Sequence, residues 1–394
     1  MNDTLRQFRD FFVSLQLTVV LLILSMILVF VATLDQVNLG IWAVQEKYFR
    51  SFAVLWQIPG SSLSIPVFPG GYFLGGLLLI NLVCAHVYRF QMTWRKSGIQ
   101  LAHAGLILLL IGELITGLMQ EESFMRMDTG QTKRYSESFH DNELVLIDHS
   151  QPDTTDVVAI PEALLADKSS IQHPRLPFQV NVKEYFPNST LQMRNQAQGM
   201  PGAVSASAGF GTQLALVPLR MTYKPNERNV PGVLVEIVGP GGNLGVWMAS
   251  QMLAQPQVFQ HEGRTWEIGL RQKRHYKPFT LTLLKFSHDK YPGTEIPRNF
   301  SSRVRLKSDD GAEDREVLIF MNNPLRHAGL TFYQAGFDNN DTTSILQVVR
   351  NPGWLLPYIA CVLMGVGLTI QFGISLGAFV RRRFAAGASA PAAS

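Results

Sequence analysis

The chain has 394 residues, of which 46% are hydrophobic and 16% are charged, and its formal net charge at pH 7 is +4. This small charge does not indicate a nucleic-acid partner, and no basic stripe with interleaved aromatic residues is present. The length allows more than one domain, and the composition divides into apolar stretches and one long polar stretch.

Four apolar stretches predict membrane-spanning helices at about 13–34, 72–93, 99–119 and 354–376. Each has about 20 residues, enough for a helix to cross the hydrocarbon core. The first stretch is not typical of a cleavable signal peptide, because its apolar run is long and is followed by Asp35 and Gln36.

Basic residues next to these spans predict their orientation. They precede the first span, fill the link between the second and third, and follow the fourth: Arg6, Arg9, Arg89, Arg95, Lys96, Arg381, Arg382 and Arg383. Because such residues accumulate on the cytoplasmic side, both termini are expected in the cytoplasm. The loop at 35–71 and the insert at 120–350 are then on the outer side.

The outer loop at 35–71 contains apolar residues at helical spacing, flanked by Trp42 and Trp56. They are Ile41, Val44, Tyr48, Phe52 and Leu55. This spacing predicts a short amphipathic helix in the membrane interface. The alternative is a loop that packs on the outer domain.

The insert at 120–350 has short β-rich runs separated by clusters of Gly, Pro, Asn and Asp, which predict strands. The runs are 142–147, 178–185, 232–239, 279–286, 301–308, 316–321 and 330–337. A β-sandwich or an open barrel is expected. The segment at 187–213 is poor in bulky apolar residues and is expected to be a mobile loop. The last ten residues, "AAGASAPAAS", are expected to be disordered.

The predicted fold class is therefore a membrane protein with four transmembrane helices and a large all-β domain inserted between the third and fourth. The N-terminal membrane region occupies 1–119 and the β domain 120–350. The fourth membrane segment occupies 351–380 and a cytoplasmic tail 381–394.

The insert shows no enzyme signature. Its histidines lack paired ligand spacing, and no nucleophile elbow or phosphate loop is present; they are His140, His149, His173, His261, His275, His288 and His327. The basic run "RQKRHYKPF" at 271–279 is interpreted as a solvated turn between strands, or else as a docking patch for an acidic ligand or for propionates. Cys84 and Cys361 lie in apolar spans and are expected to be small buried residues. Because no CxxC is present, thiol–disulfide chemistry is not expected of this chain.

Two ionisable residues, His103 and Glu113, occur within "LAHAGLILLLIGELITG", where a charged group is costly and a functional role is the default hypothesis. His86 lies at a similar depth in the preceding span. Because the link between the two spans is short, the two imidazoles are expected near one another, and neutral imidazole is a good iron ligand. Interhelical hydrogen bonding is the alternative. Glu113 is expected to face the helix bundle or a partner, or to hydrogen-bond within its helix.

Several segments carry a family resemblance. These are "FRDFFVSLQLTVVLL", "LAHAGLILLLIGELITG", "PFTLTLLKFSHDKYPGTEIPRNFSSRV" and "MNNPLRHAGLTFYQAGFD". Together they resemble the ResB family of cytochrome c biogenesis proteins. The resemblance runs along nearly the whole chain and is least evident at 187–213.

The resemblance implies a subunit of the System II cytochrome c synthetase in a bacterial inner membrane, with its β domain in the periplasm. Such proteins pair with a CcsA-type (ResC-type) membrane protein that bears the tryptophan-rich haem-presenting motif. The complex carries haem b outward and attaches it to the CxxCH cysteines of apocytochrome c. Thioredoxin-like proteins supply the reductant nearby. The chain itself is expected to be an accessory subunit without catalytic activity of its own.

The family also implies that His103 is an axial haem ligand and that a partner-chain span provides the second. His86 is the alternative second ligand, and His327 is a candidate for contact with haem or apocytochrome. Two other functions stay open from the residues alone. One is a membrane-anchored β-type sensor or secretion protein, and the other is a haem-b electron carrier that uses His86 and His103.

Overall fold

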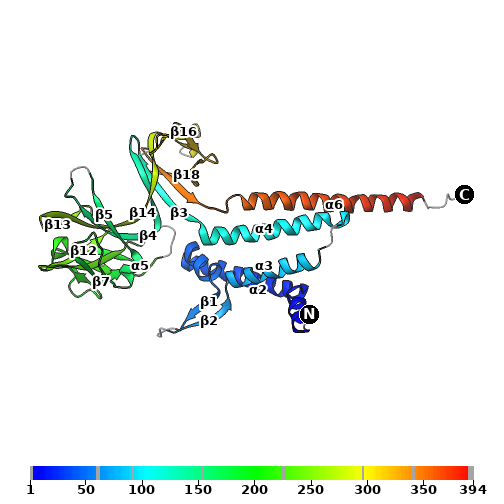
Figure 1. Ribbon diagram of the computed structural model, residues 1–394, viewed down its shortest axis with the longest axis horizontal. Coiled ribbons are helices and arrows are strands. Elements are labelled where there is room, and N and C mark those ends of the chain that lie inside the picture. Colours follow the sequence, from blue (N-terminus) through cyan, green and yellow to red (C-terminus); the bar gives the residue numbers. More distant parts are fainter. Residues whose placement is uncertain are drawn as a thin grey trace. The chain divides into compact units, whose positions relative to one another are not determined.

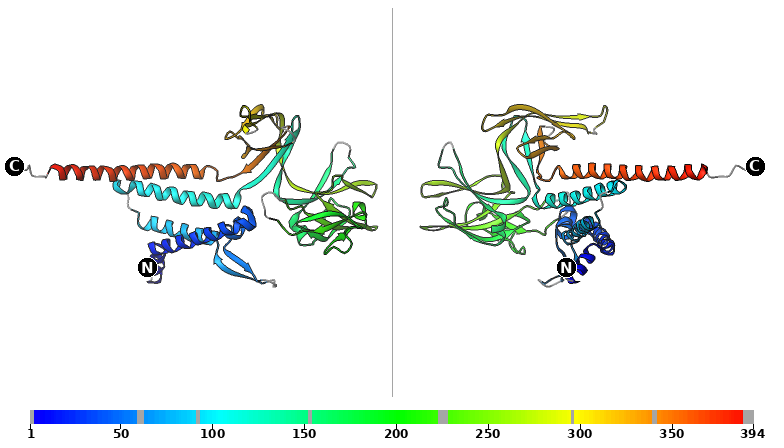
Figure 2. Two further views of the ribbon diagram at one scale, coloured as in Figure 1. Left: turned by 180° about the vertical axis from the view of Figure 1, so that it is seen from behind. Right: turned by 45° about the vertical axis from the view of Figure 1, so that its right-hand side comes forward.

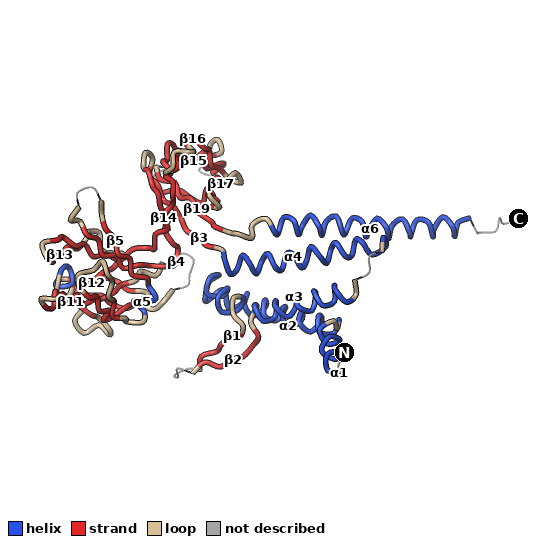
Figure 3. Tube along the Cα trace, in the orientation of Figure 1, coloured by secondary structure: helices blue, strands red, loops and turns tan. Residues whose placement is uncertain are grey.

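The computed structural model describes residues 3–58, 63–90, 93–151, 154–222, 228–294, 297–338 and 342–388. The chain forms two compact units: a helical unit of Met1–Glu121 with Asn351–Ser394, and a β unit of Glu122–Arg350. Figure 3 shows that nearly all long helices belong to the first unit and most strands to the second. The four apolar helices and the large β-rich region expected from the sequence are present.

The helical unit contains four helices that are long and apolar enough to cross a membrane, within Leu15–Phe49, Gly71–Tyr88, Trp94–Met119 and Leu356–Phe384. Within this unit, α2, α3, α4 and α6 run alongside one another in Figures 1 and 2. The helical elements are α1 (Asp3–Phe12), α2 (Leu15–Val44), η1 (Gln45–Phe49), α3 (Gly71–Tyr88), η2 (Trp94–Lys96), α4 (Ser97–Met119) and α6 (Leu356–Ala388). The first four residues of the tail expected to be disordered, 385–388, instead belong to α6, and the remaining residues, 389–394, lie outside the described residues.

The secondary structure of the outer loop at 35–71 differs in part from the predicted amphipathic helix. Helix α2 does not end near residue 34 but extends to Val44 and then into η1, with a kink at Gly40, whose φ of 73° is not helical. The amphipathic helix predicted through Leu55 is wrong in its second half, because Leu55 lies in β1 (Ala53–Gln57), which pairs with β2 (Ser64–Pro69). Val54 is buried and Leu55 is exposed, which is the alternation of a strand.

A buried asparagine on α3 fixes the junction between α1 and α2. The Asn81 amide nitrogen donates to the carbonyl oxygens of Phe12 at 2.7 Å and Ser14 at 3.1 Å. Its carbonyl oxygen accepts from the Thr18 hydroxyl at 2.6 Å. These bonds satisfy backbone groups that the break between the two helices leaves open, so the polar residue is accommodated in an apolar helix.

Helices α4 and α6 pack through glycines at seven-residue intervals, Gly98, Gly105 and Gly112, all of which are buried. A Cβ atom on Gly98 would lie 2.5 Å from the carbonyl oxygen of Gly367 on α6. One on Gly105 would lie 2.7 Å from the Cγ atom of Met364. The missing side chains therefore let the two backbones approach closely, as is usual between apolar helices.

The β unit contains all seven of the strand runs predicted for the insert, which confirms those predictions. Its elements also include the short helices α5 (Glu162–Ala166) and η3 (Gly209–Thr212). The strands are β3 (Glu121–Asp128), β4 (Thr132–Asp148), β5 (Asp156–Pro161), β6 (Ser170–Ile171), β7 (Gln179–Phe186), β8 (Ser189–Met193), β9 (Val204–Ser205), β10 (Leu214–Pro218), β11 (Gly232–Gly239), β12 (Gly242–Ser250), β13 (Gln257–His261), β14 (Arg264–Lys290), β15 (Pro297–Ser308), β16 (Asp314–Phe320), β17 (Leu325–His327), β18 (Leu330–Asp338) and β19 (Thr343–Arg350).

Two hydrophobic cores divide the β unit into two lobes that share the long strands β4 and β14. In the first lobe, the sheet β12-β11-β7-β6 faces β13, β5 and the paired ends of β4 and β14, as in a sandwich. In the second lobe, the strand order is β16-β15-β14-β4-β3-β19-β18-β17. The edge strand β16 contacts β17 and β18 at the other edge of this sheet, so the sheet curves round as in an open barrel. Both of the expected β architectures therefore occur.

The segment expected to be a mobile loop at 187–213 is instead folded. It contains β8 and β9, which pair with β10, and buries Ala197 and Ala206 in two small cores. Its small residues are required by close packing, because a side chain on Gly211 would collide with Ala206. Low content of bulky residues thus reflects tight packing here, not disorder.

Candidate functional site

The helical unit brings together the two histidines that the sequence placed at similar depth. His86 comes from α3 and His103 from α4, and their ring centroids lie 6.4 Å apart with the ring planes at 25°. The ring of His86 also contacts Phe90 edge-on at 5.7 Å. The expected proximity of the two imidazoles is confirmed.

The hydrogen bond of His103 determines which of its two ring nitrogens could act as a metal ligand. Its Nδ1 lies 2.8 Å from the carbonyl oxygen of Ile99, one turn earlier on α4. Because a carbonyl only accepts, Nδ1 carries the proton and the lone pair of the neutral ring is on Nε2. Metal-ligating histidines commonly have such a bond on the other ring nitrogen. The side chain of His103 is exposed, so Nε2 can reach a group outside this chain.

Helical geometry explains why His103 faces α3. At about 100° per residue, His103 lies roughly 160° around α4 from Gly105. Gly105 contacts α6, so α4 turns one face to α6 and nearly the opposite face to α3. The bond to Ile99 was not predicted, although the four-residue spacing of the two residues is visible in the sequence.

Two other expectations for the apolar helices need correction. Glu113 is exposed on α4, so it does not face the helix bundle of this chain, and the other expectation, contact with a partner, stays a prediction. Cys361 is exposed and Cys84 is partly exposed, so neither is the fully buried residue expected from the sequence. These positions lie on surfaces that α3, α4 and α6 leave uncovered.

His327, the candidate for contact with haem or apocytochrome, makes side-chain contacts within the β unit. It ends β17, just before a tight turn at Ala328 and Gly329, whose φ angles are 49° and 74°. Its Nδ1 lies 2.9 Å from a carboxylate oxygen of Glu313, and its ring packs edge-on against Phe279 at 4.7 Å. These two contacts within the β unit are sufficient to explain why a histidine occurs at this position.

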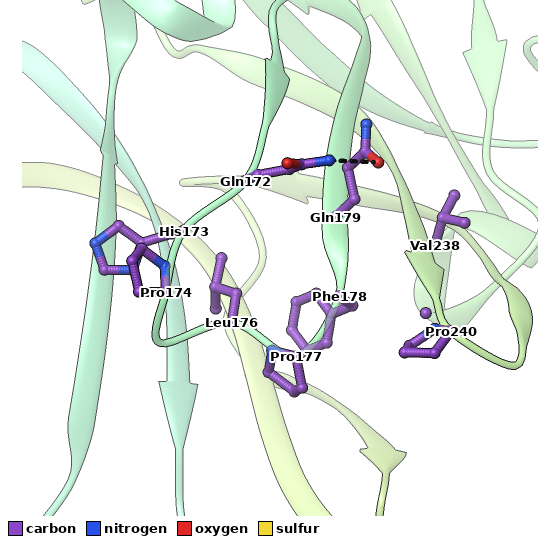
Figure 4. A pocket seen from close by; sticks show the side chains of 10 residues that line it. Gln172, His173, Pro174, Leu176, Pro177, Phe178, Gln179, Val238 and Pro240 are labelled. Atoms are coloured by element: carbon purple, nitrogen blue, oxygen red, sulfur yellow. Dashed lines mark hydrogen bonds between the residues drawn. The ribbon is translucent and has the colours of Figure 1, made fainter.

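The β unit also has an open cavity of about 660 Å³ beside the β6–β7 loop. Figure 4 shows Gln172 and Gln179 side by side in its lining, with Gln172 Nε2 donating to Gln179 Oε1 at 3.3 Å. The one imidazole in its lining, His173, accepts the backbone N–H of Arg175 at 3.2 Å. These three side chains are thus bonded within the protein, and the lining of this cavity presents no nucleophile with an adjacent base.

The basic run at 271–279 is not the expected turn, because it lies in the middle of β14. Arg271 pairs with Glu143 at 2.8 Å and Arg274 with Glu137 at 3.3 Å, both on β4. Across the described residues, no three side chains of His, Cys, Asp or Glu gather into a metal-binding group.

Comparison with known proteins finds a family similarity in one part of the chain. Residues 241–345 match the model of the ResB-like family. This part of the chain is therefore similar to the ResB-like family. It is also 33% identical over 107 residues to Protein NrfI of Wolinella succinogenes, over 25% of this chain and 12% of that relative's length.

The ResB-like match covers part of the β unit, from β12 into β19, and includes His327. It does not include the helical unit, so the roles of His86 and His103 depend on their own geometry. The chain spans only about one eighth of the relative's length, so activities of that larger protein do not transfer directly.

Proposed function

We propose that this ResB-like protein is a haem-handling subunit in cytochrome c biogenesis. The ResB-like match over 241–345 is the observation that carries the proposal. In this function, haem is the cargo: the chain and a CcsA-type partner carry haem b across the bacterial inner membrane. They then position it for thioether attachment to apocytochrome c.

The proposed topology has both termini in the cytoplasm and the β unit in the periplasm. It is supported by basic residues gathered at one end of the helical unit. The Arg89 guanidinium donates to the carbonyl oxygen of Val13 at 2.9 Å, and the Arg9 guanidinium lies 5.6 Å from the Tyr88 ring centroid. These contacts bring the basic flanks of α1 and α3 together, and such flanks favour the cytoplasmic side.

His103 is the proposed iron ligand, through Nε2. Its bond to Ile99 orients the ring, and a neutral imidazole avoids the cost of a charge in the membrane. Since His86 and Arg89 belong to the same end of α3, the site belongs to the cytoplasmic half of the membrane in this topology. Haem would enter there, with the second ligand from the partner and His86 as the nearest imidazole in this chain.

The chain is proposed to be an accessory subunit that positions haem and client and does not form the thioether bonds alone. Its six tryptophans are scattered singly, whereas haem presentation is attributed to a tryptophan-rich motif of the partner. The reductant is assigned to separate thioredoxin-like proteins.

A haem-b electron carrier is the second candidate, and the His86–His103 distance of 6.4 Å favours it, since both axial ligands would come from one chain. Quinol reduction of the purified haem-loaded chain separates the two. An electron carrier cycles with quinol and needs no CcsA-type partner to hold haem.

The test of the main proposal is expression in a bacterial host that lacks its own cytochrome c maturation system. Co-expression of this chain with a CcsA-type partner and an apocytochrome c is expected to yield covalently attached haem, detected by haem staining after denaturing electrophoresis. Omitting this chain is expected to abolish the product. Equal holocytochrome c without this chain would contradict the proposed function.

A further inference from the structure

The shared strands β4 and β14 carry an aromatic and cationic patch where the two lobes meet. It consists of Lys133, Tyr135, Glu137, Arg274 and Tyr276, called here the Tyr135 patch. The Arg274 guanidinium lies 4.1 Å from the Tyr135 ring centroid, and the Lys133 ammonium lies 5.3 Å from it. The Tyr276 ring is 5.7 Å from that of Tyr135, and Tyr276 is 59% exposed.

The strand register explains this grouping. Tyr276 lies directly opposite Tyr135, and Arg274 lies opposite Glu137, so the four side chains share one face of the sheet. The register breaks between Tyr276 and Leu281. Such irregularities bend a strand and redirect its side chains, often next to functional sites.

The cations around the patch differ in how they are neutralised. Three arginines have carboxylate partners: Arg274 with Glu137, Arg271 with Glu143 and Arg126 with Asp338. Lys133 has no carboxylate within ion-pair distance among the described residues, and its contact is the face of Tyr135. Arg274 also hydrogen-bonds Tyr276, which holds that ring in place.

The surroundings of Lys133 favour an added anion. Burial lowers the pKa of its ammonium most; Glu137 and Asp128 act in the opposite direction, and the neighbouring Arg274 and Arg126 lower the pKa further. A partly dehydrated cation beside a like charge gains more from a bound carboxylate than a fully solvated lysine does. The exposed ring of Tyr276 supplies an apolar surface next to it.

We propose that the Tyr135 patch binds a planar aromatic ligand that carries a carboxylate, with Lys133 pairing with the carboxylate and Tyr276 stacking on the ring. A tetrapyrrole with propionate groups has this chemistry. The inference therefore rests on the proposed haem-handling function and adds a substrate contact on the β unit that requires no iron ligation.

The test uses the full-length chain with His86→Ala and His103→Ala, titrated with metal-free protoporphyrin, so that iron ligation makes no contribution. Porphyrin fluorescence reports binding. Lys133→Met and Tyr276→Leu are each expected to weaken binding about tenfold, as expected for loss of a charge-assisted contact or a stacked ring. The dimethyl ester of the same porphyrin is expected to bind more weakly and to be insensitive to Lys133→Met.

Lys273→Met is the matched control, because Lys273 is an exposed lysine adjacent in sequence to Arg274 and lies outside the Tyr135 patch. Circular dichroism checks that each variant is folded. Unchanged protoporphyrin affinity in Lys133→Met, or an equal loss in Lys273→Met, would overturn the proposal. So would binding of anionic lipid vesicles that depends on Lys133 while porphyrin binding does not. Retention of iron-haem absorbance by the His103-containing complex reports the proposed function separately.

Discussion

The Nδ1 atom of His103 lies 2.8 Å from the carbonyl oxygen of Ile99 on the same helix. This bond leaves Nε2 as the nitrogen that could act as a metal ligand and restrains rotation of the ring. The neighbouring His86 lacks a comparable backbone bond in the described part of the chain, so its ring is less well oriented. The ring of His103 is therefore more restrained than that of His86, which favours His103 as the proposed iron ligand.

The first prediction compares these histidines. His103→Ala is expected to lower haem absorbance of the complex purified with its partner by about tenfold or more, since direct ligation exceeds the effect of a supporting hydrogen bond. His86→Ala is expected to cause a smaller loss. His103→Gly with added imidazole is expected to recover part of the haem and of the cytochrome c product.

Comparable membrane levels of the chain, measured by immunoblot, are the control for these variants. A wild-type haem spectrum and full cytochrome c assembly in His103→Ala would show that the ligand is elsewhere. Failure of His86→Ala alone would move the ligand from α4 to α3.

A second prediction concerns the α4–α6 contact. Gly105→Val places atoms against Met364 and the Ala360 carbonyl oxygen, which a Cβ would approach to 2.7 and 2.8 Å. Overpacking of this kind is expected to destabilise the helical unit by about 1–3 kcal/mol. Thermal unfolding in detergent measures the loss. Gly365→Val on α6 is the control, because nothing lies within 4 Å of a Cβ there, and an equal loss in both variants would reject a specific packing role.

A third prediction concerns pH and the β unit. Burial disfavours the charge on Asp148, but hydrogen bonds from Ser150 and the Arg264 guanidinium outweigh burial and lower its pKa below the ordinary 3.8. A lowered folded pKa stabilises the fold above pH 3.8, and this contribution disappears as the pH falls through the folded value. Asp148→Asn is expected to cost about 1–2 kcal/mol at pH 7.

The difference between wild type and Asp148→Asn is expected to shrink below pH 3.8 in denaturant unfolding followed at each pH. The exposed Asp156, opposite Asp148 in the ladder, provides the control variant Asp156→Asn, for which little change is expected. A difference independent of pH would mean that the carboxylate charge is not what stabilises this site.

The fourth prediction concerns topology. Reporter fusions that are active only in the periplasm are expected to be inactive at Ser394 and active when inserted at Gly202 in the β unit. The basic residues at the ends of the spans motivate this arrangement. Activity at Ser394 would place the C-terminus outside and reverse the proposed orientation.

Several features were predictable from the sequence because their causes are local. A helix that crosses hydrocarbon needs about 20 apolar residues, and period-2 alternation marks a half-buried strand, so both the spans and the strand runs were visible as patterns. The short link between α3 and α4 makes them antiparallel neighbours, which was enough to predict that His86 and His103 lie close together.

Other features depend on partners that are distant in the chain, and only the tertiary structure decides them. The 271–279 run has the composition of a turn, but pairing with β4 makes it a strand, with Glu137 and Glu143 as partners for its arginines. The 187–213 segment has the composition of a loop, but tight packing against β10 and its neighbours orders it. Leu55 fits a helical period, yet its pairing with β2 makes it part of a hairpin. Local pattern reports what a segment can form, whereas the contacts made by its neighbours in space select which of those forms has the lowest free energy.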